Sequence, residues 1–194
     1  MKGTRHGSAT VEFPSDREVL VTRRFDAPAE LVFDALTKPE HVRMWFGAKE
    51  LEVCEIDFRV GGAYHFVGFV MEGDTATCSF RGTYLEIERP VRLAGTWVFD
   101  GRPDAEAMET VELREEDGIT TMTDRLTFKD QATRDSTKWA AADGVHADEG
   151  GQVSLDRLEY YLAAGTAAPC LPALVEVVRV ELTCEAGTHA WRWL

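Results

Sequence analysis

The segment from Phe25 to Phe46, FDAPAELVFDALTKPEHVRMWF, places the tightest limits on how this chain can fold. It ends a β-rich run, turns at residues 26–28 and then shows apolar residues at helical spacing. Pro28 has the fixed φ of a first helical turn, and Pro39 interrupts a helix because it lacks a backbone N–H. The segment therefore predicts two short helices in series, the second ending at Trp45.

Seven runs of alternating or aromatic-rich sequence predict β-strands, one before the helical pair and six after it. They cover residues 18–24, 51–57, 63–71, 76–87, 92–99, 108–114 and 119–128. The connections between the later strands are short, which predicts an antiparallel meander, because parallel pairs need long crossovers. One connection, RVGG at residues 59–62, is explained as a tight turn with a local salt bridge from Arg59.

An apolar stripe containing Leu155, Leu158 and Leu162 predicts a closing C-terminal helix over Gln152–Ala164. Residues 134–142 also have helical propensity. We expect a break or kink at Gly150–Gly151, because glycine inside a helix costs about 0.5–1 kcal/mol relative to alanine. The predicted fold class is α+β, with a seven-stranded antiparallel curved sheet gripping a long C-terminal helix and two short helices between strands one and two.

Several short motifs occur in a specific order. They are RRFDAP at 23–28, VF at 32–33, TKPE at 37–40, Trp45, DFRVGG at 57–62, GTYLE at 82–86 and SLDRL at 154–158. In order and spacing they resemble the START-like or birch-allergen-like helix-grip superfamily (SRPBCC). Within it they resemble the family related to the C-terminal domain of activators of a heat-shock chaperone ATPase. The resemblance covers roughly residues 19–164 and implies the helix-grip fold. Relatives usually carry a large apolar or aromatic residue where this chain has Gly151.

Length and composition predict one domain. The chain has 194 residues, 44% of them hydrophobic, and we expect the domain at 18–165 between a flexible N-terminal extension at 1–17 and a C-terminal extension at 166–194. The alternating run at 175–183 either adds a strand to a sheet edge or belongs to a disordered tail.

The net charge of −13 argues against nucleic-acid and anionic-membrane partners. No apolar run approaches the roughly 20 residues of a membrane span, and no secretory signal is apparent, which favours the cytoplasm. The sequence has no phosphate-loop or dinucleotide motif and no metal-ligand spacing among its histidines, so we expect no cofactor and no metal.

The functional question is whether the space between sheet and closing helix holds a ligand. Strand alternation places Asp124 on an otherwise apolar face, and the candidate ligand-binding residues are Tyr64, Phe66, Trp97, Phe99, Met122, Asp124, Leu126, Leu155 and Leu158. Asp124 with His65 or Tyr84 is the candidate catalytic group. The alternative interpretation is that Asp124 is held by Arg125, Arg114 or a backbone amide, or faces solvent. In the same way, His65 is a histidine whose hydrogen bonds are satisfied, or one that is half-exposed.

Three functions follow. The first is a binding module for a small hydrophobic or aromatic molecule. The second, implied by the superfamily, is a cavity enzyme of the polyketide cyclase or dehydratase type. The third, implied by the chaperone-activator relatives, is a co-regulator that contacts a chaperone. The sequence leaves open the ligand, any reaction and whether the protein is a dimer.

Overall fold

The computed structural model describes residues 9–47, 51–68, 78–137 and 147–165. Its strands form one antiparallel sheet in the order β1-β2-β8-β7-β6-β5-β4-β3. The strands are β1 Thr10–Glu12, β2 Glu18–Phe25, β3 Val53–Ile56, β4 Ala63–Gly68, β5 Cys78–Glu88, β6 Arg92–Phe99, β7 Ala107–Glu116 and β8 Ile119–Phe128. The helices are α1 Ala29–Thr37, α2 Pro39–Trp45, α3 Gln131–Thr137 and α4 Ala147–Ala164.

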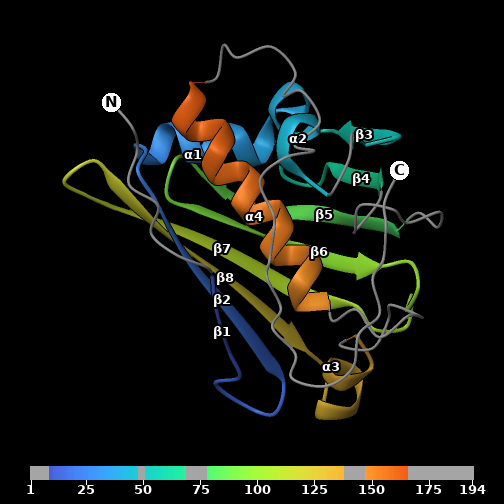
Figure 1. Cartoon of the computed structure of the whole chain (residues 1–194). Coiled ribbons are helices and arrows are strands. Elements are labelled where there is room, and N and C mark those ends of the chain that lie inside the picture. Colours follow the sequence, from blue (N-terminus) through green and yellow to red (C-terminus); the bar gives the residue numbers. More distant parts are fainter. Residues whose placement is uncertain (1–8, 48–50, 69–77, 138–146, 166–194) are drawn as a thin grey trace, which may run out of the picture.

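The sheet curves around α4, which runs across its concave face, while α1 and α2 lie at one end of that face (Figure 1). This arrangement confirms the predicted α+β helix-grip class and, apart from β1 and α3, the predicted order of one strand, two helices, six strands and a closing helix. The turn at residues 59–62 is as predicted, with Gly61 at a φ of 80° and an Arg59–Asp57 ion pair of 2.8 Å. No helix in the described part of the chain is long and apolar enough to cross a membrane.

The sheet has eight strands rather than seven, because β1 forms where the sequence predicts no strand. Thr10 lies opposite Thr22, and Glu12 lies opposite Leu20. The side chain of Gln152 on α4 holds the residue before β1 through two hydrogen bonds. Its Oε1 accepts the Ala9 N–H at 2.9 Å, and its Nε2 donates to the Ala9 carbonyl at 2.8 Å. Gln152 is 143 residues away from Ala9 in sequence, so this contact gives the strand no local signal.

The predicted break at Gly150–Gly151 is wrong, because α4 continues through both glycines. The cost of the two glycines, about 0.5–1 kcal/mol each, is smaller than the gain from burying the apolar stripe that follows them. Leu158 is fully buried in that stripe, and Tyr161 is 2% exposed. The predicted helical propensity at 134–142 corresponds in part to α3, and its remainder lies outside the described residues, as does the predicted strand at 175–183.

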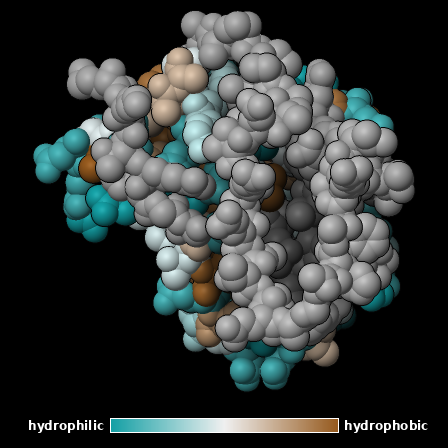
Figure 2. Space-filling model, viewed as in Figure 1, coloured by the Kyte–Doolittle hydropathy of each residue, from teal (hydrophilic) through white to brown (hydrophobic). Residues whose placement is uncertain are grey.

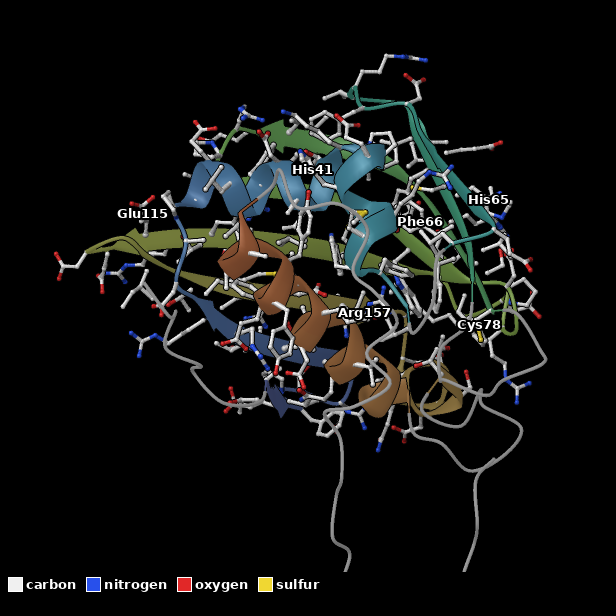
Figure 3. All side chains as sticks on the ribbon, turned by 45° about the horizontal axis from the view of Figure 1, so that its top comes forward. His41, His65, Phe66, Cys78, Glu115 and Arg157 are labelled. Carbon is white, nitrogen blue, oxygen red and sulfur yellow. The ribbon has the colours of Figure 1, made fainter. Side chains whose placement is uncertain are left out.

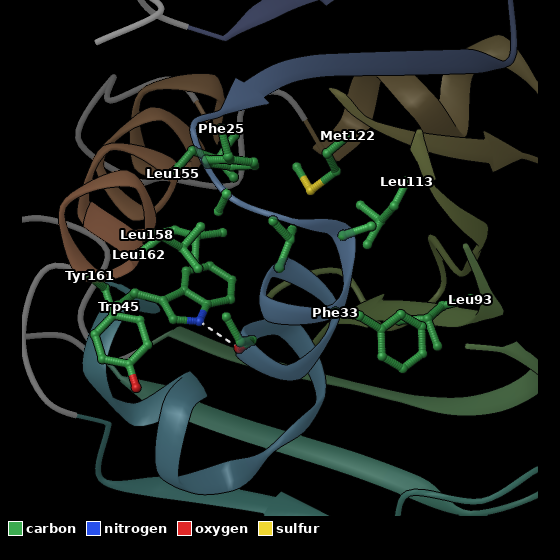
Figure 4. Packing of buried hydrophobic residues seen from close by; sticks show 14 residues of the cluster. Phe25, Phe33, Trp45, Leu93, Leu113, Met122, Leu155, Leu158, Tyr161 and Leu162 are labelled. Carbon is green, nitrogen blue, oxygen red and sulfur yellow. Dashed lines mark hydrogen bonds between the residues drawn. The ribbon is translucent and has the colours of Figure 1, made fainter. Parts of the chain in front are cut away.

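Trp45 joins the helices to one another (Figure 4). Its indole is 6% exposed, and its Nε1 donates to the Ala35 carbonyl at 2.8 Å. Around it packs the larger of two hydrophobic clusters, which includes Phe25, Phe33, Leu93, Leu113, Met122, Leu155, Leu158, Tyr161 and Leu162. The smaller cluster lies towards the β3 edge and contains Val42, Leu51, Cys54, Tyr64, Phe66 and Tyr84.

Arg23 links β2 to α4 through charge. Its side chain points to the concave face and is 1% exposed. Its Nη2 donates to Asp156 Oδ1 at 2.8 Å and also to Glu159 Oε2. Two carboxylates on successive turns of α4 therefore neutralise one buried guanidinium, which fixes the helix over the sheet.

Candidate functional site

Two carboxyl side chains lie on the apolar concave face, between the two hydrophobic clusters. Residues directly opposite one another in an antiparallel pair share a face of the sheet. Asp124 of β8 is opposite Val111 and Val21, and Glu109 of β7 is opposite Leu126 and Gly95. Asp124 and Glu109 are thus diagonal neighbours on the same face. The sequence analysis identified Asp124 but missed Glu109.

Tyr64 reaches this pair from β4. Its hydroxyl donates to the Thr96 carbonyl at 3.2 Å and lies 3.4 Å from Glu109 Oε2. Gly82 makes this reach possible, because a Cβ there would lie 1.9 Å from the Thr96 carbonyl oxygen and 2.6 Å from the Tyr64 ring. The Tyr64 ring occupies the space that a side chain at position 82 would need.

Burial changes the charge state of these groups. Oδ1 of Asp124 has no accessible surface and no hydrogen-bond donor in the described structure. Burial raises the pKa of Asp124 to about 7. Burial, and then the negative charge of Asp124, raises the pKa of Glu109 well above its usual value. Burial likewise raises the pKa of the Tyr64 and Tyr84 hydroxyls. Near neutral pH, both tyrosines therefore hold their protons, Asp124 is divided between its two states, and burial disfavours the charged form of Glu109.

Aromatic rings line the concave face beside the pair. The ring centroids of Tyr64 and Tyr84 are 5.5 Å apart, and those of Phe80 and Trp97 are 5.9 Å apart. Phe99 continues the second row at 5.3 Å from Phe80. The arrangement is an apolar, aromatic wall with a few polar groups at its centre, which is the usual composition of a ligand site.

The structure separates the predicted ligand-binding residues into three groups. Met122, Leu155 and Leu158 pack in the larger hydrophobic cluster, and each is at most 9% exposed. Tyr64 and Phe66 belong to the smaller cluster. Trp97, Phe99 and Leu126 stay half-buried on the concave face with Asp124.

His65 lies on the opposite face from Asp124, so the structure does not bring these two predicted partners together. Figure 3 shows His65 and Phe66 leaving β4 on different sides. His65 Nε2 is 3.0 Å from Ser79 Oγ, and the Ser79 hydroxyl donates to Asp100 on the convex face. Tyr84, the other predicted partner, is on the concave face next to Tyr64.

Open space adjoins the first half of α4 at Gly151. Gly151 precedes Leu155 by four residues and Leu158 by seven, which places it on the same inward stripe of the helix. Even so, Gly151 is exposed, and a Cβ there would meet no atom within 4 Å. Figure 2 shows hydrophobic residues at the surface among hydrophilic ones on this side of the molecule.

No metal site is apparent in the part of the chain that the structure covers: no three His, Cys, Asp or Glu side chains there are placed to share an ion. Glu109 and Asp124 are two carboxyls without a third ligand. Their raised pKa values suit proton exchange or hydrogen bonding to an organic group.

Solved structures with the same fold share low sequence identity with this chain. A protein from Rhodobacter sphaeroides is 24% identical with a TM-score of 0.66, over 80% of this chain and 98% of that one. A protein from Mycobacterium smegmatis is 17% identical with a TM-score of 0.68, over 80% and 97%. A protein from Staphylococcus epidermidis is 25% identical with a TM-score of 0.61, over 80% and 94%.

A comparison with proteins of curated function finds no match. The sequence profile of one family, described as activator of Hsp90 ATPase homolog 1-like protein, matches residues 26–163. That match runs from the turn before α1 to the last turn of α4, so it spans the carboxyl pair and, except for Phe25, the buried residues of both hydrophobic clusters. It also confirms the resemblance drawn from the sequence motifs. The chain therefore belongs to the family of activator of Hsp90 ATPase homolog 1-like proteins.

Proposed function

We propose that this protein binds a small, largely apolar molecule in a hollow between the concave face of the sheet and the first half of α4. The observation that carries the proposal is the open space at Gly151, on the inward stripe of the closing helix. Half-buried Trp97 and Leu126 at the centre of the sheet support it, because a side chain in a solidly packed interior would be fully buried. An apolar hollow with a few polar groups fits such a ligand.

A second function, catalysis inside the same hollow, is favoured by the carboxyl pair. A general base works best with a pKa near the operating pH, and burial brings Asp124 to about 7. Glu109, whose pKa is raised above its usual value, would then be the candidate acid. The chaperone partner and the cytoplasmic location expected from the sequence stay predictions.

The binding proposal is tested with the neutral fluorescent probe N-phenyl-1-naphthylamine. The parent protein should bind it with saturable fluorescence enhancement. Gly151→Trp should weaken binding at least tenfold, because the indole would occupy the open space, while the melting temperature changes little. Leu85→Trp is the matched control, since Leu85 is 43% exposed on β5, outside the concave face, and this variant should bind like the parent.

Failure of the parent to bind the probe would overturn the proposal. Equal binding by Gly151→Trp and Leu85→Trp would overturn the assigned position of the hollow.

A further inference from the structure

We infer that the molecule bound in this hollow carries a protonated amine on its apolar body, held by the Asp124 carboxylate with Glu109 beside it. The inference rests on the proposed function and specifies its ligand class.

The carboxyl pair lacks a counter-ion among the described residues. The titratable groups that face it are Tyr64 from β4, Tyr84 from β5, Arg23 from β2, and Asp156 and Glu159 from α4. Arg23 is already held by the two α4 carboxylates, so its single positive charge is more than matched. An ionised Asp124 would therefore be an uncompensated charge in an apolar surrounding, which is costly unless a cation arrives.

The hydrogen-bonding geometry also calls for a donor. Oδ1 of Asp124 is enclosed without a donor, whereas Glu109 Oε2 lies 3.4 Å from the Tyr64 hydroxyl. A neutral apolar ligand would leave Oδ1 of Asp124 without a hydrogen-bond donor. An ammonium group supplies both a positive charge and several N–H donors. It therefore provides the counter-charge and the hydrogen bond that the described protein groups do not give the Asp124 carboxylate.

The wall beside the pair suits a cation. Tyr84 lies across from Gly95, which in turn lies across from Glu109, so no side chain separates the tyrosine from the carboxyl along that line. Trp97 lies across from Ala107, two residues from Glu109 on β7. The faces of tyrosine and tryptophan rings attract cations, and this attraction is stronger where water is excluded.

Binding of a cation should be linked to proton release. With the pKa of Asp124 near 7, the ionised fraction rises from roughly one-tenth at pH 6 to roughly nine-tenths at pH 8. A primary ammonium stays charged over this range, as lysine does with its pKa of about 10.4. The affinity for an amine should therefore increase about tenfold from pH 6 to pH 8, whereas the affinity for a neutral analogue should not change.

The test compares 1-naphthylmethylamine with 1-naphthylmethanol, which have the same rings and differ in the charged group. Calorimetric titration of the full chain at pH 6, 7 and 8 should show tighter binding of the amine, increasing about tenfold with pH, and flat binding of the alcohol. Asp124→Asn should remove the amine's advantage and its pH dependence while keeping alcohol binding. Glu106→Gln, at an exposed position on no strand, is the matched control and should behave like the parent.

The pH dependence of the two affinities is measured on the parent protein and needs no variant. The inference can therefore be tested even if Asp124→Asn folds poorly. Equal, pH-independent affinities for amine and alcohol would overturn the inference and leave the proposed function standing. Binding of N-phenyl-1-naphthylamine without binding of 1-naphthylmethylamine would likewise overturn the inference and leave the proposed function standing. If none of the three compounds binds, the proposed function fails together with the inference.

Discussion

Asp124 and Glu109 occupy positions where an apolar side chain would fit the surrounding residues better. Their neighbours across the strands are Val21, Val111 and Leu126. Burial raises the pKa of both carboxyls, which means that the folded state disfavours their charged forms. Residues that reduce stability in this way are often kept for function.

The pair should make stability fall as the pH rises. The pKa of Asp124 is about 7 in the folded protein, against about 3.9 in an unfolded chain, so its contribution to stability is full below pH 4 and lost between pH 4 and 7. Asp124→Asn should flatten this decline and be more stable than the parent at pH 8, as measured by urea unfolding at several pH values. Hydrogen bonds from Thr133 lower the pKa of Asp130, so the contribution of Asp130 to stability is lost as the pH falls below about 4. A parallel decline in parent and variant would contradict the prediction.

Part of the site was predictable from single residues. Alternation on β8 places Asp124 with Met122 and Leu126, as the sequence predicts. The same rule places Glu109 with Val111 and Leu113 on β7, so the signal for Glu109 was present, but a strand rich in Glu looks solvent-exposed. The approach of Tyr64 to Glu109 was not predictable, because it depends on sheet curvature across two intervening strands.

Elements are held together by a few contacts between distant residues. Trp45 connects α2 to α1 through its hydrogen bond to Ala35 and packs against α4 within the larger cluster. Arg23 connects β2 to α4. These two connections act at different parts of α4 and involve different forces, one apolar and one ionic.

Trp45→Ala should cost about 3–5 kcal/mol of unfolding free energy, because it removes a large buried ring and leaves a cavity. Chemical denaturation of the parent and variant measures this difference. Tyr160→Ala provides the control, since Tyr160 is 41% exposed on α4, and it should cost far less. Similar losses for both variants would mean that Trp45 does not join the helices as described.

Arg23→Met should cost about 3 kcal/mol, because it leaves Asp156 and Glu159 without their buried cation. Adding Asp156→Asn and Glu159→Gln to Arg23→Met should recover most of the loss, since the uncompensated charges are then gone. Thermal unfolding of the single and triple variants compares the two. No recovery in the triple variant would indicate that Arg23 acts mainly by packing.

At the level of elements, strands and helices with strong local patterns were predicted correctly, within a few residues at their ends. The sequence analysis failed where tertiary contacts decide the outcome. β1 is three residues long and depends on β2 and Gln152, and α4 keeps its helix through Gly150 and Gly151 because the stripe beyond them is buried. Local propensity amounts to less than 1 kcal/mol per residue, so packing overrides it.

The whole molecule carries a net charge of −13, and its like charges repel one another in the compact state. Salt screens this repulsion, with a Debye length of about 10 Å at 0.1 M. Raising sodium chloride from about 0.02 M to about 0.2 M should therefore increase the melting temperature in scanning calorimetry. A lower melting temperature in salt would mean that the surface ion pairs outweigh the repulsion.

The position of β2 in the sheet has a consequence for how the chain reaches its native state during synthesis. Strands β3 to β8 pair in sequence order, so each can add to the previous one as it leaves the ribosome. β2 pairs with β8, with Glu18 opposite Thr127, and Arg23 meets Asp156 across a separation of 133 residues. Contacts this distant in sequence slow folding. The edge of β2 that faces β8 therefore stays unpaired until β8 has been synthesised. During this interval the nascent chain is most prone to aggregate and has the greatest need of a chaperone.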